Sequence, residues 1–377
     1  MILVLHNRYR TTGGEERAVE DLQWLIRERL GEEAELLTRD SALVGRTRAA
    51  AGLLGGGLRP DDVGKAVRRT GARIVHAHNL HPTLGWRALA AAREAGAKVV
   101  MHLHQYRLVC AVGVCFTHGE DCTRCQGRNT LPGVLRNCRG SVVEGITYGA
   151  ALALWQPRVA GLAEAFVVPS AFALARLRAL RAPVSQAHVL PHVIRSFAGE
   201  STAAQGRHAL VVARLAPEKG VDVAIEACRI AGVPLVVAGD GPERERLVAA
   251  AGPGVTFAGR VEDAELVRLR AEALLALAPS RSGETFGLAA AEAMAAGVPV
   301  VASCVGALPE LVAREWLVPP DDAPALAAAI GRLRAGAAQA GEQAIERARL
   351  LCDPDVVAGK LSEIYAAAER GQAASRA

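Results

Sequence analysis

Two glutamates in the second half of the chain are the residues best suited to chemistry. Glu284 and Glu292 stand eight positions apart in the stretch APSRSGETFGLAAAEAMAAGVP, which covers residues 278–299. The apolar run 273–278 predicts a buried parallel strand, and the alanine-rich run 288–296 predicts a helix. If Glu284 begins the first helical turn, both carboxylates lie on roughly one face, because eight residues make slightly more than two turns. The alternative is a pair of solvated glutamates on an ordinary surface helix.

The loop between this strand and this helix predicts an anion-binding site. It brings the backbone N–H groups of Phe286, Gly287 and Leu288 to the helix N-terminus, where unpaired N–H groups and the helix dipole favour negative charge. Gly287 has no side chain and lets a ligand approach the backbone closely. Since the neighbouring carboxylates would repel a phosphate, we expect them to accept hydrogen bonds from sugar hydroxyls instead.

Two cations follow another predicted strand of the same half. Arg214 and Lys219 come after the run 209–213, in a loop that opens a helix. A further strand, 235–238, ends in the turn GDGP at 239–242. Ligands of open parallel sheets bind outside the carboxyl ends of the strands. We therefore expect Arg214 and Lys219 to converge with the loop before the 288–296 helix on one ligand.

Four segments of this half carry a family resemblance. RLAPEKG, AGDGPERERL, FAGRV and SGETFGLAAAEAMAAGVPVVAS, in this order and spacing, resemble the nucleotide-sugar domain of the retaining GT-B glycosyltransferases of family four. The resemblance covers nearly the whole second half. It implies an α/β fold of two Rossmann-like, doubly wound parallel-sheet domains that face each other across a cleft. It also implies transfer of a hexosyl group, with retention, from a nucleotide diphosphate sugar to a glycan, lipid-linked or small-molecule acceptor.

The resemblance also implies roles for the donor-site residues. Arg214 and Lys219 would neutralise the diphosphate without a catalytic divalent metal ion, since no D-x-D pair is placed to hold one. Glu284 would bind the hydroxyls of the sugar ring, and Glu292 those of the ribose. UDP- or GDP-sugars are the donors we expect. The other donor-site residues are Gly239, Arg260, Val261, Phe286, Gly287 and Leu288, with the FAGRV stretch contacting the base through its backbone.

Other functions fit the same scaffold. A pseudo-glycosyltransferase that joins non-sugar cyclitols, a nucleotide-sugar-binding protein and a nucleotide-sugar epimerase all stay open as alternatives. An NAD-dependent enzyme would need G-x-G-x-x-G after the first strand, and Gly13-Gly14 does not supply it.

Two features of the first half resemble the family's acceptor side. Gly13 and Gly14 open a helix after the first predicted strand, near where the family places acceptor and donor phosphate, although a plain strand-to-helix turn explains them equally well. His104 follows the strand 98–102 where relatives carry a histidine, usually followed by Asp or Asn; here Gln105 follows. The resemblance implies that His104 binds a hydroxyl of the transferred sugar or organises the reacting centre.

Histidines and cysteines of the first half also suggest metal sites. His76, His78 and His81 have the types of metal ligands, but we favour a strand-end loop lining the acceptor cleft. Five of the eight cysteines fall within residues 110–138. Their spacing predicts a structural zinc site, as in the family's cysteine-insert subset; reduced thiols and a disulfide are the alternatives. The ligands we expect are Cys110, Cys122, Cys125 and Cys138, with Cys115 spare and His118 as a substitute.

Length and charge indicate the overall organisation. We expect an acceptor-binding domain at 1–196 that contains the insert 110–138, a nucleotide-sugar domain at 207–352, and a terminal helix and tail at 353–377 that pack back toward the first domain. Residues 1–195 carry 26 Lys and Arg against 16 Asp and Glu, whereas the rest carry 18 against 23. A basic first half suits an anionic acceptor or peripheral contact with a membrane.

Composition and apolar runs narrow the class further. Only 4% of the residues are aromatic, so we expect no nucleic-acid partner, because single-stranded nucleic acids are bound on aromatic platforms. No apolar run approaches the ~20 residues of a membrane-spanning helix, and the first residues lack the features of a signal peptide. We therefore expect a cytoplasmic protein, either free or at the inner face of the membrane.

Overall fold

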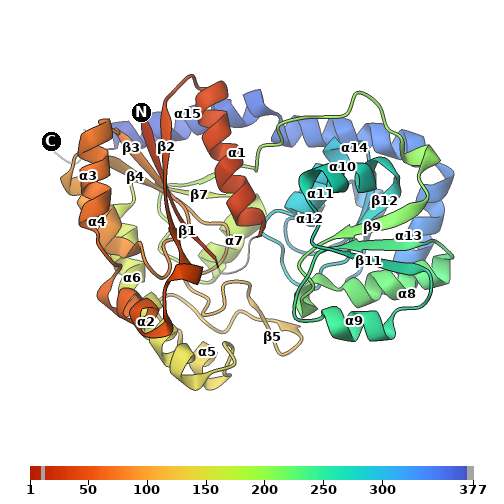
Figure 1. The fold of residues 1–377 in the computed structure, drawn as a ribbon, viewed down its shortest axis with the longest axis horizontal. Coiled ribbons are helices and arrows are strands. Elements are labelled where there is room, and N and C mark those ends of the chain that lie inside the picture. Colours follow the sequence, from red (N-terminus) through yellow and green to blue (C-terminus); the bar gives the residue numbers. More distant parts are fainter. Residues whose placement is uncertain (10–12, 372–377) are drawn as a thin grey trace. The chain divides into compact units, whose positions relative to one another are not determined.

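The chain folds into two compact units. The computed structural model describes residues 1–9 and 13–371. Unit 1 contains Met1–His118, Cys122–Val193 and Pro354–Ala377, and unit 2 contains Gly119–Asp121 and Ile194–Asp353. Each unit is built on one six-stranded parallel sheet with helices packed against it (Figure 1). Among the described residues, no helix combines the length and the apolar character needed to cross a membrane.

The sheet of unit 1 has the strand order β2-β1-β3-β4-β7-β8. Its strands are β1 (Ile2–Arg8), β2 (Ala34–Asp40), β3 (Ile74–Ala77), β4 (Lys98–His102), β7 (Ala165–Val168) and β8 (Ala187–Val189). The helices of this unit are α1 (Gly14–Glu28), α2 (Arg46–Gly55), α3 (Asp61–Thr70), α4 (Gly85–Glu94), α5 (Leu131–Leu135), α6 (Val142–Leu162), α7 (Ala171–Ala179) and α15 (Pro354–Arg370). Two short strands, β5 (Phe116–Thr117) and β6 (Glu120–Asp121), lie between β4 and α5 in the sequence.

Successive residues of these strands point to opposite faces of the sheet, and both faces are buried. Leu3, Leu5, Val75 and Phe166 belong to the core that α3, α4 and α6 cover. Ile2, Val4, Ile74 and Val100 belong to the core that α1 and α15 cover, where Leu361 and Tyr365 of α15 are buried. Two-sided burial explains why these strands are continuous apolar runs rather than alternating ones.

The sheet of unit 2 has the strand order β11-β10-β9-β12-β13-β14. Its strands are β9 (His208–Val212), β10 (Leu235–Ala238), β11 (Val255–Gly259), β12 (Ala273–Ala278), β13 (Val300–Ser303) and β14 (Leu317–Val318). Its helices are α8 (Val221–Ala231), α9 (Arg244–Ala250), α10 (Asp263–Ala271), α11 (Leu288–Ala295), α12 (Leu308–Leu311), α13 (Ala323–Ala335) and α14 (Ala337–Cys352). Because β10 and β12 flank β9 on opposite sides, the strand order reverses between β9 and β12. In doubly wound sheets this reversal marks the ligand site.

Two segments of unit 1 have local features of their own. The Gly- and Ala-rich residues 41–57 form the 3₁₀ turn Ser41–Leu43 and the short helix α2. Helix α6 runs to Leu162 through Pro157. Proline cannot donate to the carbonyl four residues earlier, and Arg128 Nε donates to that Ala153 oxygen at 2.9 Å instead. A side chain distant in sequence thus satisfies the acceptor that the proline leaves.

Candidate functional site

The loops that follow β9 and β12 lie at the strand reversal of unit 2 and are joined by an ion pair. Lys219, in the loop after β9, donates from Nζ to Oε1 of Glu284, in the loop after β12, at 2.5 Å. Ser280 Oγ donates to the same carboxylate oxygen at 2.7 Å. Two residues that the sequence assigned to one ligand site are therefore in direct contact.

This ion pair is partly shielded from water. The Lys219 and Glu284 side chains are 26% and 19% exposed. Burial by itself would raise the pKa of Glu284, but the charge of Lys219 and the hydrogen bonds from Lys219 and Ser280 outweigh it and lower the pKa. Glu284 is therefore ionised at neutral pH. Arg214 is half-exposed and pairs with Glu218, four residues further along the chain.

Helix α11 begins one residue after Gly287. Gly287 is the N-cap residue and has φ of 95°, the left-handed conformation that favours glycine. Glu284 lies three residues before this cap, so it does not begin the first turn. The shared helical face proposed for Glu284 and Glu292 therefore does not form. The first N–H groups of a helix have no carbonyl one turn earlier within it, and Glu284 of the ion pair lies four residues before Leu288, the first residue of α11.

Glu292 has a partner that the sequence analysis did not name. Arg270, on α10, forms an ion pair with Glu292, and the two side chains are 9% and 11% exposed. No local pattern links positions on two different helices, so only the fold could reveal this contact.

Arg281, which was not among the predicted site residues, also connects the two loops that carry Lys219 and Glu284. Arg281 donates from Nη1 and Nη2 to the two carboxylate oxygens of Asp222 at 2.8 and 3.0 Å, and from Nη1 to the Pro217 carbonyl at 3.0 Å. Such two-pronged contacts fix geometry as well as charge. Arg281 thus holds the loop after β12 against the loop after β9.

The remaining predicted donor-site residues also follow strands of unit 2. Gly239, after β10, has φ of 141°, and a Cβ there would lie 1.9 Å from the Ala213 carbonyl oxygen. Arg260 and Val261 follow β11, the first exposed and the second half-buried. Phe286 is buried in the core beneath α11.

Unit 1 has a pocket of its own at the carboxyl ends of β1, β3 and β4. Tyr9, Glu15, His104 and Arg107 are among its lining residues. Gly13 is the N-cap of α1, and its N–H donates to Glu16 at 2.8 Å; Gly14 is the first helical residue. Residues 10–12, which precede this glycine pair, lie outside the described part of the chain.

Tyr9 and Glu15 form a polar wall of this pocket. Tyr9 donates from its hydroxyl to Glu15 Oε2 at 2.8 Å, and the Arg107 guanidinium lies 4.7 Å from the centre of the Tyr9 ring. Burial raises the pKa of Glu15, which His6, Tyr9 and Arg107 only partly offset. Glu15 was not a predicted site residue, because a glutamate in the first turn of a helix is explained by the helix dipole alone.

His104 is buried among other histidines. Its Nε2 lies 2.7 Å from Nδ1 of His78, and its ring stacks on His102 with centroids 4.1 Å apart. Burial, and then the neighbouring His192, lower the pKa of His104. Its imidazole is therefore neutral at pH 7.

The five clustered cysteines line one pocket of unit 1. The lining includes the four predicted zinc ligands and also Cys115, which the prediction left spare. Each of the five is a free thiol. A hydrogen bond from Cys115 lowers the pKa of Cys110 to about 6. His118, the predicted substitute ligand, has its Nε2 2.8 Å from the Arg136 carbonyl oxygen. Within the described residues, the trios of possible metal-ligand atoms within 4.8 Å of one another are formed by histidines, not by these cysteines.

Comparison with known structures defines the fold class. Over 97% of its length the chain resembles a sucrose-phosphate synthase from Thermosynechococcus elongatus, with a TM-score of 0.70, 19% identity and 98% of that chain covered. It also resembles Anabaena HepE in complex with UDP-glucose, with a TM-score of 0.63, 18% identity and coverages of 97% and 99%. The fold is that of the GT-B glycosyltransferases.

Sequence comparison then gives the family. Residues 206–335 match the family model described as glycosyl transferases group 1. A segment of 179 residues is 37% identical to a glycogen synthase of Mycobacterium tuberculosis and covers 43% of each chain. The match thus spans less than half the length of this relative. Residues 206–335, which lie in unit 2, thus carry the resemblance to the glycosyl transferases group 1.

Proposed function

We propose that the protein is a retaining glycosyltransferase that moves a hexosyl group from a nucleotide diphosphate sugar to an acceptor hydroxyl. The observation that carries this proposal is the Lys219–Glu284 pair, which joins two loops at the strand reversal of unit 2. A cation, a carboxylate and a helix N-terminus at such a reversal match the needs of a sugar diphosphate. Unit 2 would be the nucleotide-sugar domain and unit 1 the acceptor-binding domain.

In this proposal the diphosphate binds at the mouth of α11. Lys219 has three N–H donors, so it can keep its bond to Glu284 and still donate to a phosphate oxygen. Arg214, half-exposed, can turn from Glu218 to the same group. These charges would meet the negative charge of the leaving diphosphate without a catalytic divalent metal ion, and each contact is worth roughly 2–4 kcal/mol of barrier.

The carboxylates of Glu284 and Glu292 would bind the hydroxyls of the transferred sugar and of the ribose. Glu284, held by Lys219 and Ser280, would accept hydrogen bonds from hydroxyls of the transferred sugar. Glu292 would bind the ribose hydroxyls, with the ion pair to Arg270 holding its carboxylate in place. Retention is proposed on the family resemblance, through a front-face route in which the leaving phosphate assists deprotonation of the acceptor.

The acceptor would bind in the pocket of unit 1. Its polar wall of Tyr9, Glu15 and Arg107 suits a hydroxylated molecule, and the neutral imidazole of His104 can accept a hydrogen bond from a hydroxyl. The excess of basic residues in the first half favours an anionic acceptor, such as a lipid-linked phosphate or an acidic glycan. With such an acceptor, the protein would act in the cytoplasm and contact the inner face of the membrane peripherally.

The cysteine pocket would hold a structural zinc ion. Five thiols around one pocket and the lowered pKa of Cys110 suit thiolate ligation. Zinc would have to draw Cys110, Cys122, Cys125 and Cys138 closer together than they lie here. The test compares the zinc content of two purified variants. Cys125→Ser, which removes a proposed ligand, should lose zinc, and Cys228→Ser, which changes a buried cysteine of unit 2, should keep it.

A nucleotide screen tests the proposed function. UDP, GDP, ADP and TDP are added to the protein in the presence of a chelator, and the melting temperature is recorded. A ligand at 100 times its Kd stabilises the folded state by about 2.7 kcal/mol. We expect UDP or GDP to stabilise the wild type but not Lys219→Ala. Equal stabilisation of both proteins, or of neither, contradicts the proposed donor site.

A further inference from the structure

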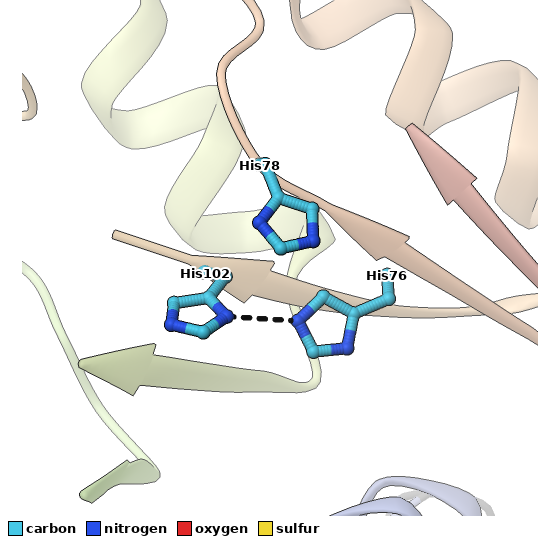
Figure 2. Close-up of side chains that lie close together, drawn as sticks. All are labelled: His76, His78 and His102. Atoms are coloured by element: carbon cyan, nitrogen blue, oxygen red, sulfur yellow. Dashed lines mark hydrogen bonds between the residues drawn. The ribbon is translucent and has the colours of Figure 1, made fainter. Parts of the chain in front are cut away.

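We propose that His76, His78 and His102 of unit 1 form a binding site for a divalent transition-metal ion. The three side chains come from the carboxyl ends of the neighbouring strands β3 and β4, and they face one another (Figure 2). Each can offer one nitrogen so that all three lie within 4.8 Å of one another. The site belongs to unit 1 alone and does not depend on the proposed donor site.

The pairing of β3 with β4 brings these histidines together. His76 lies opposite Val100 in the parallel register, and side chains two residues apart share a face of a sheet. His102 lies two positions beyond Val100 on β4, and His78, the residue after β3, lies two positions beyond His76, so both continue the row that begins at His76. All three are at least 96% buried, with relative exposures of 0%, 0% and 4%.

One nitrogen pair already has the separation that a metal ion requires. Nε2 of His76 lies 3.2 Å from Nδ1 of His102. Two nitrogens on one tetrahedral zinc ion, each at 2.0–2.1 Å from it, are about 3.3–3.4 Å apart. The 2.7 Å between His78 Nδ1 and His104 Nε2 is shorter than this and fits a hydrogen bond. His78 would therefore ligate through its other nitrogen, Nε2.

Neighbouring side chains leave the required nitrogens available. Nδ1 of His76 bonds the Tyr365 hydroxyl at 2.8 Å, so Nε2 is the nitrogen that would ligate the ion, which would replace its hydrogen bond to His102 (Figure 2). Nδ1 of His78 bonds His104, and Nε2 of His78 is buried without a hydrogen-bond partner among the described residues. Metal-binding histidines commonly have their second nitrogen held in this way. A bound ion would satisfy a buried atom that is otherwise costly.

The protonation state of the three histidines and their access to the pocket are also consistent with a metal site. Burial lowers the pKa of His76 to about 3 and also lowers the pKa of the other two, so the imidazoles are neutral, as ligation requires. His78 and His102 line the pocket at the carboxyl ends of β1, β3 and β4, which gives an ion a route to the site. Imidazole ligands suit Zn²⁺, Co²⁺, Ni²⁺ and Cu²⁺.

Cobalt titration tests the site separately from the cysteine pocket. Protein without a polyhistidine tag, carrying Cys122→Ser and Cys125→Ser, is stripped with a chelator and titrated with Co²⁺. We expect one equivalent to bind, with visible ligand-field absorption and no ultraviolet band of cobalt–thiolate bonds. Binding of no cobalt, or absorption with a thiolate band only, would overturn the proposal.

Variants in the same background assign the ligands. His102→Ala should abolish uptake of that equivalent, and His188→Ala, on β8, should leave it unchanged. Tyr365→Phe should weaken Co²⁺ binding by roughly 10–100-fold, as loss of a supporting hydrogen bond does. Full uptake by a folded His102→Ala would refute the assignment. If His102→Ala does not fold, the Tyr365→Phe variant provides the test. Unchanged Co²⁺ affinity in Tyr365→Phe would then contradict the proposed three-histidine site.

Discussion

Arg270 on α10 and Glu292 on α11 form an ion pair whose side chains are about nine-tenths buried. Replacing one partner of a buried pair leaves a charge that has lost its counter-ion, which typically costs ~3–5 kcal/mol. We predict that Arg270→Met lowers the free energy of unfolding, measured in urea, by about 3 kcal/mol. Arg268→Met on the same helix, whose ion pairs are about half-exposed, should change the free energy of unfolding far less, because exposed ion pairs contribute little. Similar losses of unfolding free energy in both variants would show that burial of the Arg270–Glu292 pair does not increase its contribution to stability.

The proposed role of Lys219 gives a second prediction. Lys219→Ala should lower kcat by roughly 30- to 1,000-fold, because a positive charge beside the leaving diphosphate lowers the barrier by roughly 2–4 kcal/mol. Lys360→Ala on α15, at an exposed position, is the control and should retain full activity. Turnover is measured as release of nucleoside diphosphate from the sugar donor. Unchanged kcat in Lys219→Ala would place the diphosphate elsewhere.

The lowered pKa of Glu284 predicts a pH dependence. A carboxyl whose pKa is lower in the folded than in the unfolded state stabilises the fold above its unfolded pKa, and this stability is lost as the pH falls through the folded value. We predict that wild type is more stable than Glu284→Gln at pH 6, and that the difference shrinks below the ordinary value of 4.5. Urea unfolding of both proteins from pH 6 to pH 3 measures this difference in the free energy of unfolding. A difference that grows toward pH 3 would mean that the pKa is raised instead.

Much of the fold was predictable because the strands are apolar runs bounded by turn residues. The strands Lys98–His102, Leu235–Ala238 and Ala273–Ala278 were predicted with the bounds that the structure has. Burial on both faces leaves no polar residue inside such a strand, so its ends are visible in the sequence. The predicted α/β fold of two parallel-sheet units is confirmed by the sheets and by the GT-B neighbours.

The parts that were missed depend on contacts between distant elements. Arg270 sits in an ordinary charged helix, and its pairing with Glu292 arises from the packing of α10 and α11. His102 was read as the last residue of a strand, and it meets His76 only through the register of β3 with β4. Sequence patterns report the period of one element, whereas these partners are set by how two elements align.

Gly239 allows a last prediction about the loops of unit 2. With φ of 141° and only 1.9 Å between an added Cβ and the Ala213 carbonyl oxygen, an alanine there must move the backbone of the loop that leads to Arg214. We predict that Gly239→Ala lowers the free energy of unfolding by ~1–3 kcal/mol, the usual range for strained backbone, and weakens nucleotide binding measured by calorimetry. Gly252→Ala, where an added Cβ meets nothing within 4 Å, should stay within ~0.5 kcal/mol of wild type. If Gly239→Ala binds nucleotide as wild type does, the close approach of these two loops is not needed for the donor site.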